Sequence, residues 1–414
     1  MADYFKGHYD FPLARKSHDK PLQGVRVIDA GNMVAGPFAT ELLADFGAEV
    51  IKLEHPRQGD GQRRLGPIKN GIPLWWKVIA RNKRCITLDL SKPEGAEVFK
   101  DLARKADVVV ENYRPGTLER WGLSYEELSR MNSRLVLLRI SGYGQTGPYR
   151  NRPGFGRVAE AIGGLANLIG EPDGPPMTPG VPLGDFISGL FGAFSVMVAL
   201  HHRDQRGREG QVIDLALHEA IFRILEYDAI QYEQLGMVHK RAGNRVTHVA
   251  PSSTFKTQDE HYVTLAASTQ SIWLRLCRAM ELEDLISNPK FLDNSNRLKH
   301  SEEINGIVAA WIAERTREEV EEAFERHEVA YSFVYDIADI FNDEHFRIRE
   351  MLIRVLDEEL GEAVVQNVVP KFSKTPGSVD FLGPTMGEHN NEIYCGELGY
   401  SKEKLKQLKD AGII

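Results

Sequence analysis

Short apolar runs alternate with amphipathic segments along the first half of the chain. The runs are rich in Val, Ile and Leu and predict β-strands over residues 25–29, 49–54, 85–90, 107–111, 135–140 and 211–216. Between them, apolar residues recur at helical spacing, as in residues 36–46 and 125–131. Strands that are apolar along most of their length are typical of a parallel sheet with helices on both faces. We therefore expect a Rossmann-like α/β domain with a parallel sheet.

One helix carries a clear start signal. Ser91 is the expected N-cap, with Pro93 in the first turn and Glu94 three residues after the cap.

The pattern of elements changes after about residue 220. The later elements predict a smaller α+β domain. They are a loop at 246–255, a strand at 261–266, an amphipathic helix at 272–280, charged helices within 302–326 and a hairpin at 357–366. The last segment, 401–411, predicts a charged amphipathic helix that packs on a surface.

Composition narrows the class of protein. The 414 residues carry a formal net charge of −8 and no basic tract, which disfavours nucleic acid as a partner. The three cysteines are far apart and form neither a metal motif nor a disulfide framework. Residues 1–20 lack the apolar core of a signal peptide, and the apolar run 186–200 is too short and too interrupted by glycine for a membrane span. We expect a cytoplasmic protein without a membrane partner.

The segment Gly180–Phe191 is the most informative in the chain. Its one carboxylate, Asp185, stands between a Pro/Gly-rich turn and a run without charge from Phe186 to Leu200, long enough for a buried helix. An aspartate in this position is either the N-cap of the helix or a reactive group. The helix dipole would keep the carboxylate ionised in both cases.

Several loops after predicted strands offer further candidates, each with a structural alternative. The turn 30–37 holds Gly31 and Gly36 but lacks GxGxxG, so a tight strand-to-helix turn is favoured over a dinucleotide site. Ligands bind beyond the carboxyl ends of strands in such sheets, where arginines suit phosphate groups. The candidates there are Asn112–Gly116 with Arg114, Arg120, the glycine-rich loop 141–148, Arg152 and Arg157, with turns and solvated arginines as the alternative. His201 and His202 lack metal-site spacing, so no metal is expected.

Taken together and in this order, these segments resemble the class III CoA-transferases, the group that includes formyl-CoA transferase and carnitine CoA-transferase. The resemblance runs from about Pro21 to the end of the chain. Its segments are Pro21–Asp29, Ala35–Pro37, Gly47–Glu54, Asn82–Arg84, Leu88–Leu90, Asn112–Gly116, Ser141–Gly144, Gly184–Asp185, Gly210–Gln211 and Gly387–His389. Their joint order over nearly the whole chain is specific, whereas no single segment is.

The resemblance implies a fold, a reaction and a site. It implies a large Rossmann-like domain over 21–220 and 345–414, a small α+β domain over 240–330 with linkers on either side, an N-terminal extension over 1–20, and an interlocked-ring dimer. Asp185 aligns with the family nucleophile, which forms a mixed anhydride and then an aspartyl-CoA thioester. Acyl-CoA is then a substrate, with no tightly bound cofactor. The implied CoA contacts are Ala35, Leu88, Asp89, Asn112, Arg114, Arg120, Arg152 and Phe155, with Arg57 in place of a family arginine at His55.

One departure bears on the substrate, and two alternative functions stay open. The region 242–251 has one glycine where formyl-CoA transferase has a glycine-rich flap, which disfavours oxalate and formate. Arg245 and His248 could instead engage a second carboxylate, as in succinyl-CoA with an aromatic or branched dicarboxylate acceptor, or serve loop structure. An α-methylacyl-CoA racemase shares the fold, but residues 152–158 lack the His-Asp pair it needs. The other alternative is a noncatalytic subunit of a heteromeric transferase, rather than a catalytic homodimer or heteromer.

Overall fold

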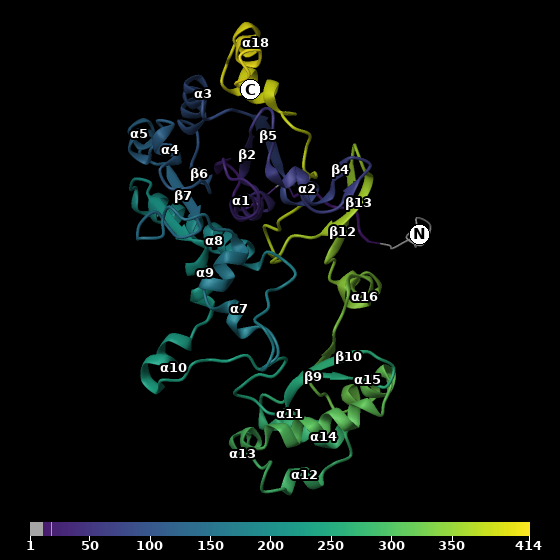
Figure 1. Cartoon of the computed structure of the whole chain (residues 1–414). Helices are drawn as coiled ribbons and strands as arrows, with labels where there is room; N and C mark the ends of the chain where they lie inside the picture. Colours follow the sequence, from purple (N-terminus) through teal and green to yellow (C-terminus); the bar gives the residue numbers. More distant parts are fainter. Residues whose placement is uncertain (1–10, 18) are drawn as a thin grey trace. The chain divides into compact units, whose positions relative to one another are not determined.

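The computed structural model describes residues 11–17 and 19–414, so most of the predicted extension 1–20 lies outside the described residues. The chain separates into two compact units (Figure 1). The larger comprises the described residues up to Leu165 together with Thr178–Ala229 and Glu344–Ile414. The smaller comprises Ala166–Met177 and Ile230–Asp343.

A six-stranded parallel sheet is the framework of the larger unit. Its strand order is β5-β2-β1-β6-β7-β8, the doubly wound order. From β1 the strands are added toward one edge as far as β5, and from β6 onward they are added toward the other edge, so the order reverses between β1 and β6. The strands are β1 (Arg26–Asp29), β2 (Glu49–Glu54), β5 (Lys83–Thr87), β6 (Val108–Glu111), β7 (Val136–Ser141) and β8 (Val212–Ala216). This confirms the predicted α/β fold with a parallel sheet.

Each face of this sheet has its own apolar core because successive strand residues point to opposite faces. Val27, Val50 and Val108 contribute to one core, together with residues of α1 (Ala35–Asp45) and α8 (Leu183–Arg206). Ile28, Ile51 and Val109 contribute to the other, with α3 (Pro93–Ala103) and α18 (Lys402–Asp410). The two layers of helices leave the ends of the strands free for a site.

The strands also carry fully buried charges. Asp29 lies between two lysines, with its Oδ2 3.0 Å from Lys83 Nζ and its Oδ1 3.6 Å from Lys52 Nζ. Thr40 Oγ1 donates to the same carboxylate at 2.7 Å, and Lys52 Nζ also lies 2.8 Å from Asp60 Oδ2. Burial alone would raise the pKa of Asp29, but the two lysines hold it below its ordinary value.

Smaller elements complete the larger unit. They are η1 (Gly61–Arg64), β3 (Ile68–Lys69), β4 (Ile72–Pro73), α2 (Leu74–Ile79), α4 (Thr117–Arg120), α5 (Tyr125–Met131), α6 (Gly156–Ile162), α9 (Leu217–Ile224), α17 (Glu344–Ile348), β12 (Leu352–Asp357), β13 (Gly361–Gln366) and η2 (Glu392–Glu397). Two further helices, α7 (Leu165–Leu168) and α10 (Asp228–Leu235), lie where the chain passes between units.

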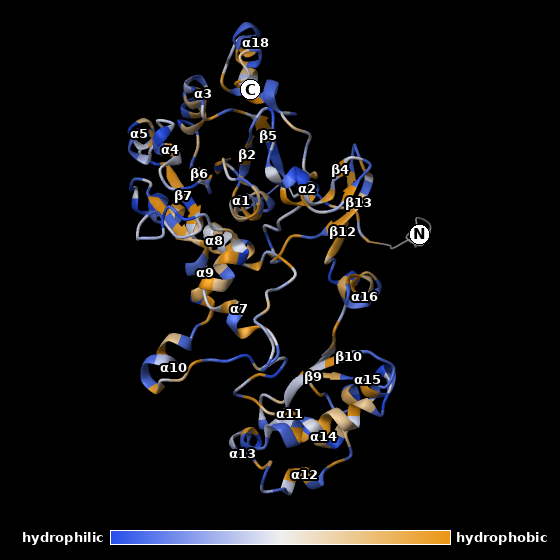
Figure 2. Cartoon of the chain, in the orientation of Figure 1, coloured by the Kyte–Doolittle hydropathy of each residue, from blue (hydrophilic) through white to orange (hydrophobic). Residues whose placement is uncertain are grey.

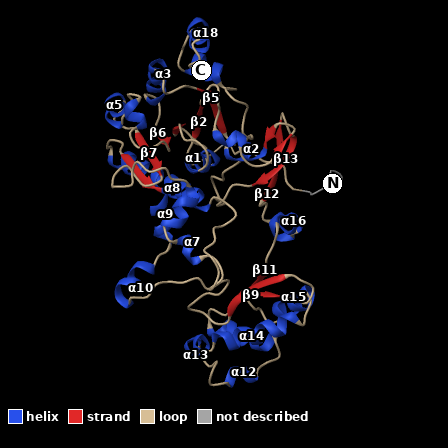
Figure 3. Cartoon of the chain, in the orientation of Figure 1, coloured by secondary structure: helices blue, strands red, loops and turns tan. Residues whose placement is uncertain are grey.

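The smaller unit is an α+β structure (Figure 3). Its antiparallel sheet has the order β11-β10-β9. The strands are β9 (Ser252–Lys256), β10 (Tyr262–Ala266) and β11 (Tyr331–Phe333), and the helices are α11 (Gln270–Ala279), α12 (Asp284–Ser287), α13 (Asn294–Lys299), α14 (Ser301–Ala313), α15 (Arg317–Arg326) and α16 (Ile337–Asn342). Phe255, Trp273 and Phe324 belong to the one core that the sheet and helices share.

Four local predictions were wrong. Strand β5 spans Lys83–Thr87 instead of 85–90, and Ser91 does not cap α3: the N-cap is Lys92, while Ser91 Oγ donates to Asp89 Oδ1 at 2.6 Å. The end of the predicted loop 246–255 forms β9, which pairs antiparallel with β10 along its whole length. Helix α8 is longer than expected, and several of its apolar side chains are exposed, so it is not a fully buried helix.

Candidate functional site

Asp185 lies in the first turn of α8 and does not cap it. The N-cap position belongs to Pro182, which has no side chain able to make a capping hydrogen bond, and Asp185 comes three residues later. The main-chain N–H of Asp185 already donates to Pro182 O at 3.1 Å. The interpretation of Asp185 as an N-cap is therefore wrong, and its carboxylate is left for another role.

The main chain of a glycine lies directly beside this carboxylate. Gly156 opens α6, and a Cβ built on it would lie 2.1 Å from Asp185 Oδ2. A Cβ on Gly184 would lie 2.6 Å from Gly156 O. One step further out, a Cβ on Gly142 would lie 2.8 Å from Gly154 Cα. Only glycine permits these close approaches, so the loops after β7 hold α6 tightly against the start of α8.

A second carboxylate lies one helical turn along α6. Glu160 is 1% exposed, and its Oε1 accepts the Gly184 N–H at 2.9 Å. Ser188 Oγ donates to the carbonyl oxygen of the same residue, Gly184, at 2.7 Å. Both polar main-chain atoms of the residue before Asp185 are therefore held by buried side chains.

The environment raises the pKa of Asp185 to about 6. Burial is the main cause, the negative charge of Glu160 adds to it, and a hydrogen bond from the Gly156 main chain acts in the opposite direction. At neutral pH the carboxylate is still mostly ionised. A carboxylate of raised pKa is more basic than an ordinary one, which favours attack on an electrophilic carbon.

The first half of α8 also packs closely against α1. A Cβ on Gly189 would lie 2.8 Å from Ala35 O, and the rings of Phe186 and Phe38 meet edge to face with centroids 4.9 Å apart. Ala35 itself is 2% exposed. The predicted contact residue Ala35 and Asp185 thus lie on two helices that touch, and Ala35 could reach a ligand only through its main chain.

The reversal point of the sheet, between β1 and β6, is closed by an asparagine pair. Asn112 Oδ1 accepts the Asn32 N–H at 2.8 Å, and Asn112 Nδ2 donates to Asn32 O at 2.7 Å. Asn112 thereby ties together the loops after these two strands. Two predicted arginines, Arg114 and Arg120, follow on the same side and are exposed, as phosphate-binding side chains must be.

The predicted residues after β2 and β5 gather near the C-terminus. The side chain of Leu88 is buried, and Asp89 accepts the Ser91 N–H at 3.0 Å while its own N–H donates to Ile413 O at 2.8 Å. His55 Nε2 lies 3.8 Å from Asp89 Oδ2. The exposed Arg57 lies against Gly412, where a Cβ would be 3.2 Å from its Nη2.

The last two predicted CoA contacts precede α6. The Arg152 guanidinium lies 3.7 Å from the ring centre of Tyr149, and Phe155 is 67% exposed at the position before Gly156. Tyr149 in turn contacts Tyr143, whose ring lies 5.8 Å from that of His218. Phe155 is therefore an exposed aromatic side chain one residue from the glycine that touches Asp185.

The predicted substrate residues Arg245 and His248 belong to the smaller unit. The Arg245 N–H donates to Ala242 O at 3.2 Å, and His248 O accepts from Asn294 Nδ2 at 2.9 Å. These bonds involve main-chain atoms of Arg245 and His248 and shape the loop. Their role toward a substrate stays a prediction.

No group of three or more His, Cys, Asp or Glu side chains suited to a metal ion occurs among residues 11–17 and 19–414. Within the same residues, α8 is long and apolar enough by length and composition to cross a membrane, contrary to the expectation for the 186–200 run. The helix extends at both ends to 24 residues, and the buried part of its surface packs on α1 and the sheet. Core helices of globular proteins pass the same test.

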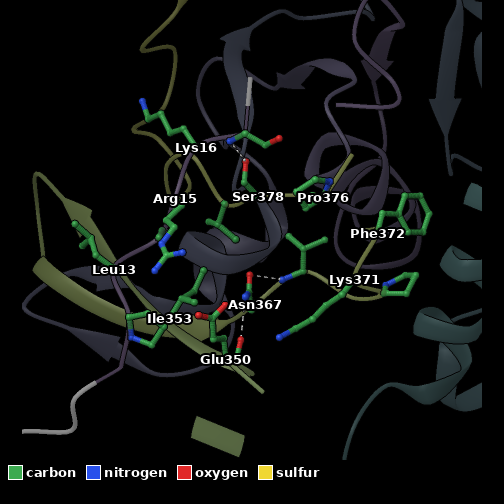
Figure 4. Close-up of a pocket in the computed structure, with 17 residues that line it drawn as sticks. Leu13, Arg15, Lys16, Glu350, Ile353, Asn367, Lys371, Phe372, Pro376 and Ser378 are labelled. Carbon is green, nitrogen blue, oxygen red and sulfur yellow. Dashed lines mark hydrogen bonds between the residues drawn. The ribbon is translucent and has the colours of Figure 1, made fainter. Parts of the chain in front are cut away.

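A separate cavity of about 430 Å³ lies between residues 12–17, the start of β12 and the loop 367–379 (Figure 4). Asn367 Nδ2 donates to Glu350 O at 2.9 Å on one side, and the Ser17 N–H donates to Ser378 Oγ at 3.3 Å on another. None of the predicted site residues lines this cavity. It is therefore distinct from the surroundings of Asp185.

Sequence reasoning missed Glu160 and gave Gly156 no role beside Asp185. Both fall in residues 152–162, where the predicted contacts were Arg152, Phe155 and Arg157. A glutamate in a short run of small and apolar residues, Val158 to Gly164, was the available signal, because a lone charge in such a run is either exposed or held by a specific partner.

Comparison with known proteins gives one consistent picture. A family model described as CoA-transferase family III matches residues 22–390. Succinyl-CoA–D-citramalate CoA-transferase of Chloroflexus aurantiacus is 42% identical and the match covers 95% of this chain and 98% of that protein. The beta subunit of succinyl-CoA–L-malate CoA-transferase of the same organism is 45% identical, and the match again covers 95% of this chain and 98% of that protein. The crystal structure of a CAIB/BAIF family protein from Brucella suis has a TM-score of 0.80 at 31% identity, covering 92% of this chain and 100% of that one.

Proposed function

The chain belongs to CoA-transferase family III, and from this we propose that Asp185 is the nucleophile through which it moves coenzyme A from succinyl-CoA to a free carboxylic acid. The observation that carries the proposal is the carboxylate of Asp185 itself. It stands in the first turn of α8 without a capping role, its pKa is raised to about 6, and only main chain separates it from α6.

The reaction proceeds through two covalent forms of Asp185. A carboxylate oxygen attacks the thioester carbon, the C–S bond breaks, and coenzyme A leaves as a thiolate, which gives a mixed anhydride. The thiolate then attacks the Asp185 carbonyl carbon of this anhydride. A C–S bond forms, and the donor acid leaves as a carboxylate. The acceptor carboxylate reverses both steps, so the new acyl-CoA forms without ATP, and main-chain N–H groups stabilise the oxyanions.

Coenzyme A binds at the carboxyl ends of the strands in this proposal. Arg114, Arg120 and Arg57 are exposed there and suit its phosphate groups. Arg152 and Phe155 lie in the segment of the chain between β7 and α8, and we propose that they contact the pantetheine arm. Ala35, Leu88, Asp89 and Asn112 are largely buried or bonded to main chain, so their contribution is through main-chain atoms and loop shape.

The names of the relatives point to the substrates. Two of them act from succinyl-CoA on malate or citramalate. We infer a short dicarboxylic acid as the acceptor here. Arg245 and His248 are the residues proposed to hold its second carboxylate, since an arginine presents two parallel donors to such a group.

A second polypeptide completes the enzyme in this proposal, as a homodimer or with a related subunit. Helices α8 and α9 are coloured largely as hydrophobic in Figure 2. Their exposed apolar side chains include Leu190, Phe194, Met197, Val198, Phe222 and Ile224. Faces of this kind favour a protein partner. The three free cysteines, two of them buried, agree with a cytoplasmic location.

Mass spectrometry of the intact protein tests the role of Asp185. Incubation with succinyl-CoA should add the mass of a CoA thioester, and hydroxylamine should leave a hydroxamate on a peptide within residues 180–191. Asp185→Asn should lose the adduct and at least ~10⁴-fold of kcat. Retention of full turnover in this variant would refute the assignment. Omission of the acceptor acid separates the racemase alternative, which turns over acyl-CoA without one.

A further inference from the structure

Glu160 is a buried carboxylate whose hydrogen bonding does not account for its charge. Its Oε1 accepts the Gly184 N–H at 2.9 Å, and its side chain is 1% exposed. Among the residues that the structure describes, none makes a hydrogen bond to its Oε2. A glutamine would accept the same N–H without bringing a second buried oxygen or a charge, so the bond to Gly184 alone does not account for a carboxylate.

The position of Glu160 relates it to Asp185 through two contacts. The first is the hydrogen bond to Gly184, the residue that precedes Asp185. The second is the glycine contact at the start of the same helix, where a Cβ on Gly156 would lie 2.1 Å from Asp185 Oδ2. Helix α6 thus touches the Asp185 turn at its first residue and again one helical turn later, and brings a like charge to the nucleophile.

We propose that Glu160 is a positioning residue of the transfer reaction, which fixes the Gly184–Asp185 peptide with one oxygen and keeps a negative charge beside the Asp185 carboxylate with the other. The inference rests on the proposed role of Asp185 as the nucleophile. In this role Glu160 acts through Asp185 and does not need to touch the substrate.

The charge acts on the covalent equilibrium. In the net half-reaction, acyl-CoA and the Asp185 carboxylate become the aspartyl-CoA thioester and the free donor carboxylate. One C–O bond and one C–S bond break and one of each forms, and the negative charge moves from Asp185 to the departing acid. A fixed negative charge at Glu160 repels the Asp185 carboxylate but not the neutral thioester. It therefore shifts the enzyme toward the covalent form.

Other charged groups on the helices and strands packed against α8 have partners of their own. Arg157, the second ionisable residue of α6, is exposed. On α1, Glu41 and Asp45 pair with Arg81, and on β7, Arg139 pairs with Glu111 and Glu119. On β8, Asp214 accepts the Gln145 N–H. On α9, Glu219 accepts the Ala216 N–H, Arg223 pairs with Glu226, and His218 lies near Gly142 O. Glu160 is the carboxylate that acts on the titration of Asp185.

Glu160→Gln tests the proposal with two linked measurements. The variant keeps an oxygen for the Gly184 N–H and loses the charge. The acid limb of kcat/KM, expected near pH 6 in the wild type, should move to lower pH, because the pKa of Asp185 falls when the neighbouring charge is removed. The equilibrium yield of aspartyl-CoA thioester, measured by intact-protein mass spectrometry at pH 8, should fall by a matching factor. A shift of half a pH unit corresponds to about a threefold fall, since protonation and acylation discharge the same carboxylate.

Two further variants separate charge from structure. Glu160→Asp keeps the charge but shortens the side chain, so its acid limb should stay near that of the wild type even if kcat falls. Glu219→Gln makes the same substitution at another carboxylate that accepts a main-chain N–H, at 3.1 Å, and should change neither measurement.

The possible outcomes are distinct. An unchanged acid limb and thioester yield in Glu160→Gln, with a wild type that is acylated normally, would overturn the inference and leave the role of Asp185 intact. A loss of kcat in Glu160→Gln without movement of the acid limb would also overturn it, because a purely structural role predicts that result. A wild type that forms no adduct with succinyl-CoA would instead contradict the proposed function.

Discussion

Two aspartates in the larger unit show how a buried carboxylate is treated in opposite ways. Asp29 is fully buried between Lys52 and Lys83, accepts a hydrogen bond from Thr40, and has a lowered pKa. Asp185 has Glu160 as its charged neighbour, and its pKa is raised to about 6. The negative charge of Asp29 is balanced by neighbouring positive charges, and that of Asp185 is not.

The difference indicates what each group is for. A paired buried charge joins the elements that supply its partners, here β1, β2, β5 and α1, and has no spare reactivity. An unpaired carboxylate destabilises the fold in its ionised form and persists only where that form is used. Local electrostatics thus separates a structural aspartate from a chemical one in the same sheet-based unit.

The largest effect is expected where pairing is removed. Asp29→Asn leaves Lys52 and Lys83 buried with one fewer negative partner, so the free energy of unfolding should fall by about 3–5 kcal/mol. Urea denaturation followed by circular dichroism measures this change. Glu127→Gln, which removes an exposed pair with Arg130, should change it by less than about 1 kcal/mol. Equal effects of the two substitutions would contradict the structural role given to Asp29.

The next effect concerns the geometry around Asp185. Gly156→Ala places a Cβ where Asp185 Oδ2 now lies, 2.1 Å away, so the carboxylate or α6 must move. A displacement of this size should lower kcat about 10²-fold. Gly306→Ala, in α14, meets open space and should leave kcat unchanged. Steady-state kinetics with both variants decides the matter, and normal turnover in Gly156→Ala would show that Asp185 does not need its present position.

The smallest effect runs in the opposite direction to the first. The raised pKa means that protonation of Asp185 stabilises the fold below the unfolded value near 3.8, and that this stabilisation is lost as pH rises through about 6. Asp185→Asn should therefore raise the free energy of unfolding by about 1–2 kcal/mol at pH 7 while it abolishes transfer. The gain should vanish near pH 4. Thermal melts at both pH values measure it, and a lower Tm of the variant at pH 7 would contradict the idea.

The sheet could be predicted from the sequence because its strands are short apolar runs separated by helices. Helix α5 was predicted at its observed bounds from apolar residues at helical spacing, and in the structure Ser124 caps it. The start of α3 was misplaced because Asp89 competes for Ser91, which a cap pattern does not reveal. Charges inside strands, such as Lys52 and Lys83, could be read from the sequence, but their common partner Asp29 could not, since strand order decides which side chains meet.

Some residues of the site could be predicted from the sequence and others could not, again because some roles depend on contacts between distant segments. Asp185 stood out because one charge preceded a long apolar run, and the resemblance to a family gave it a role. Glu160 gave no comparable signal, because its importance depends on α6 packing against α8 through Gly156 and Gly184. Contacts between helices that are distant in sequence are a property of the fold and not of either segment alone.

The glycines around Asp185 also limit how this enzyme can change. A wall of main-chain atoms offers no side chain to trim, enlarge or recharge, so single substitutions there push two helices apart instead of reshaping the space around the reactive oxygen. Laboratory evolution toward new acids would find few productive variants at Gly156 or Gly184. Diversity is better introduced at exposed positions such as Phe155, one residue away, where a side chain can be exchanged without disturbing the backbone.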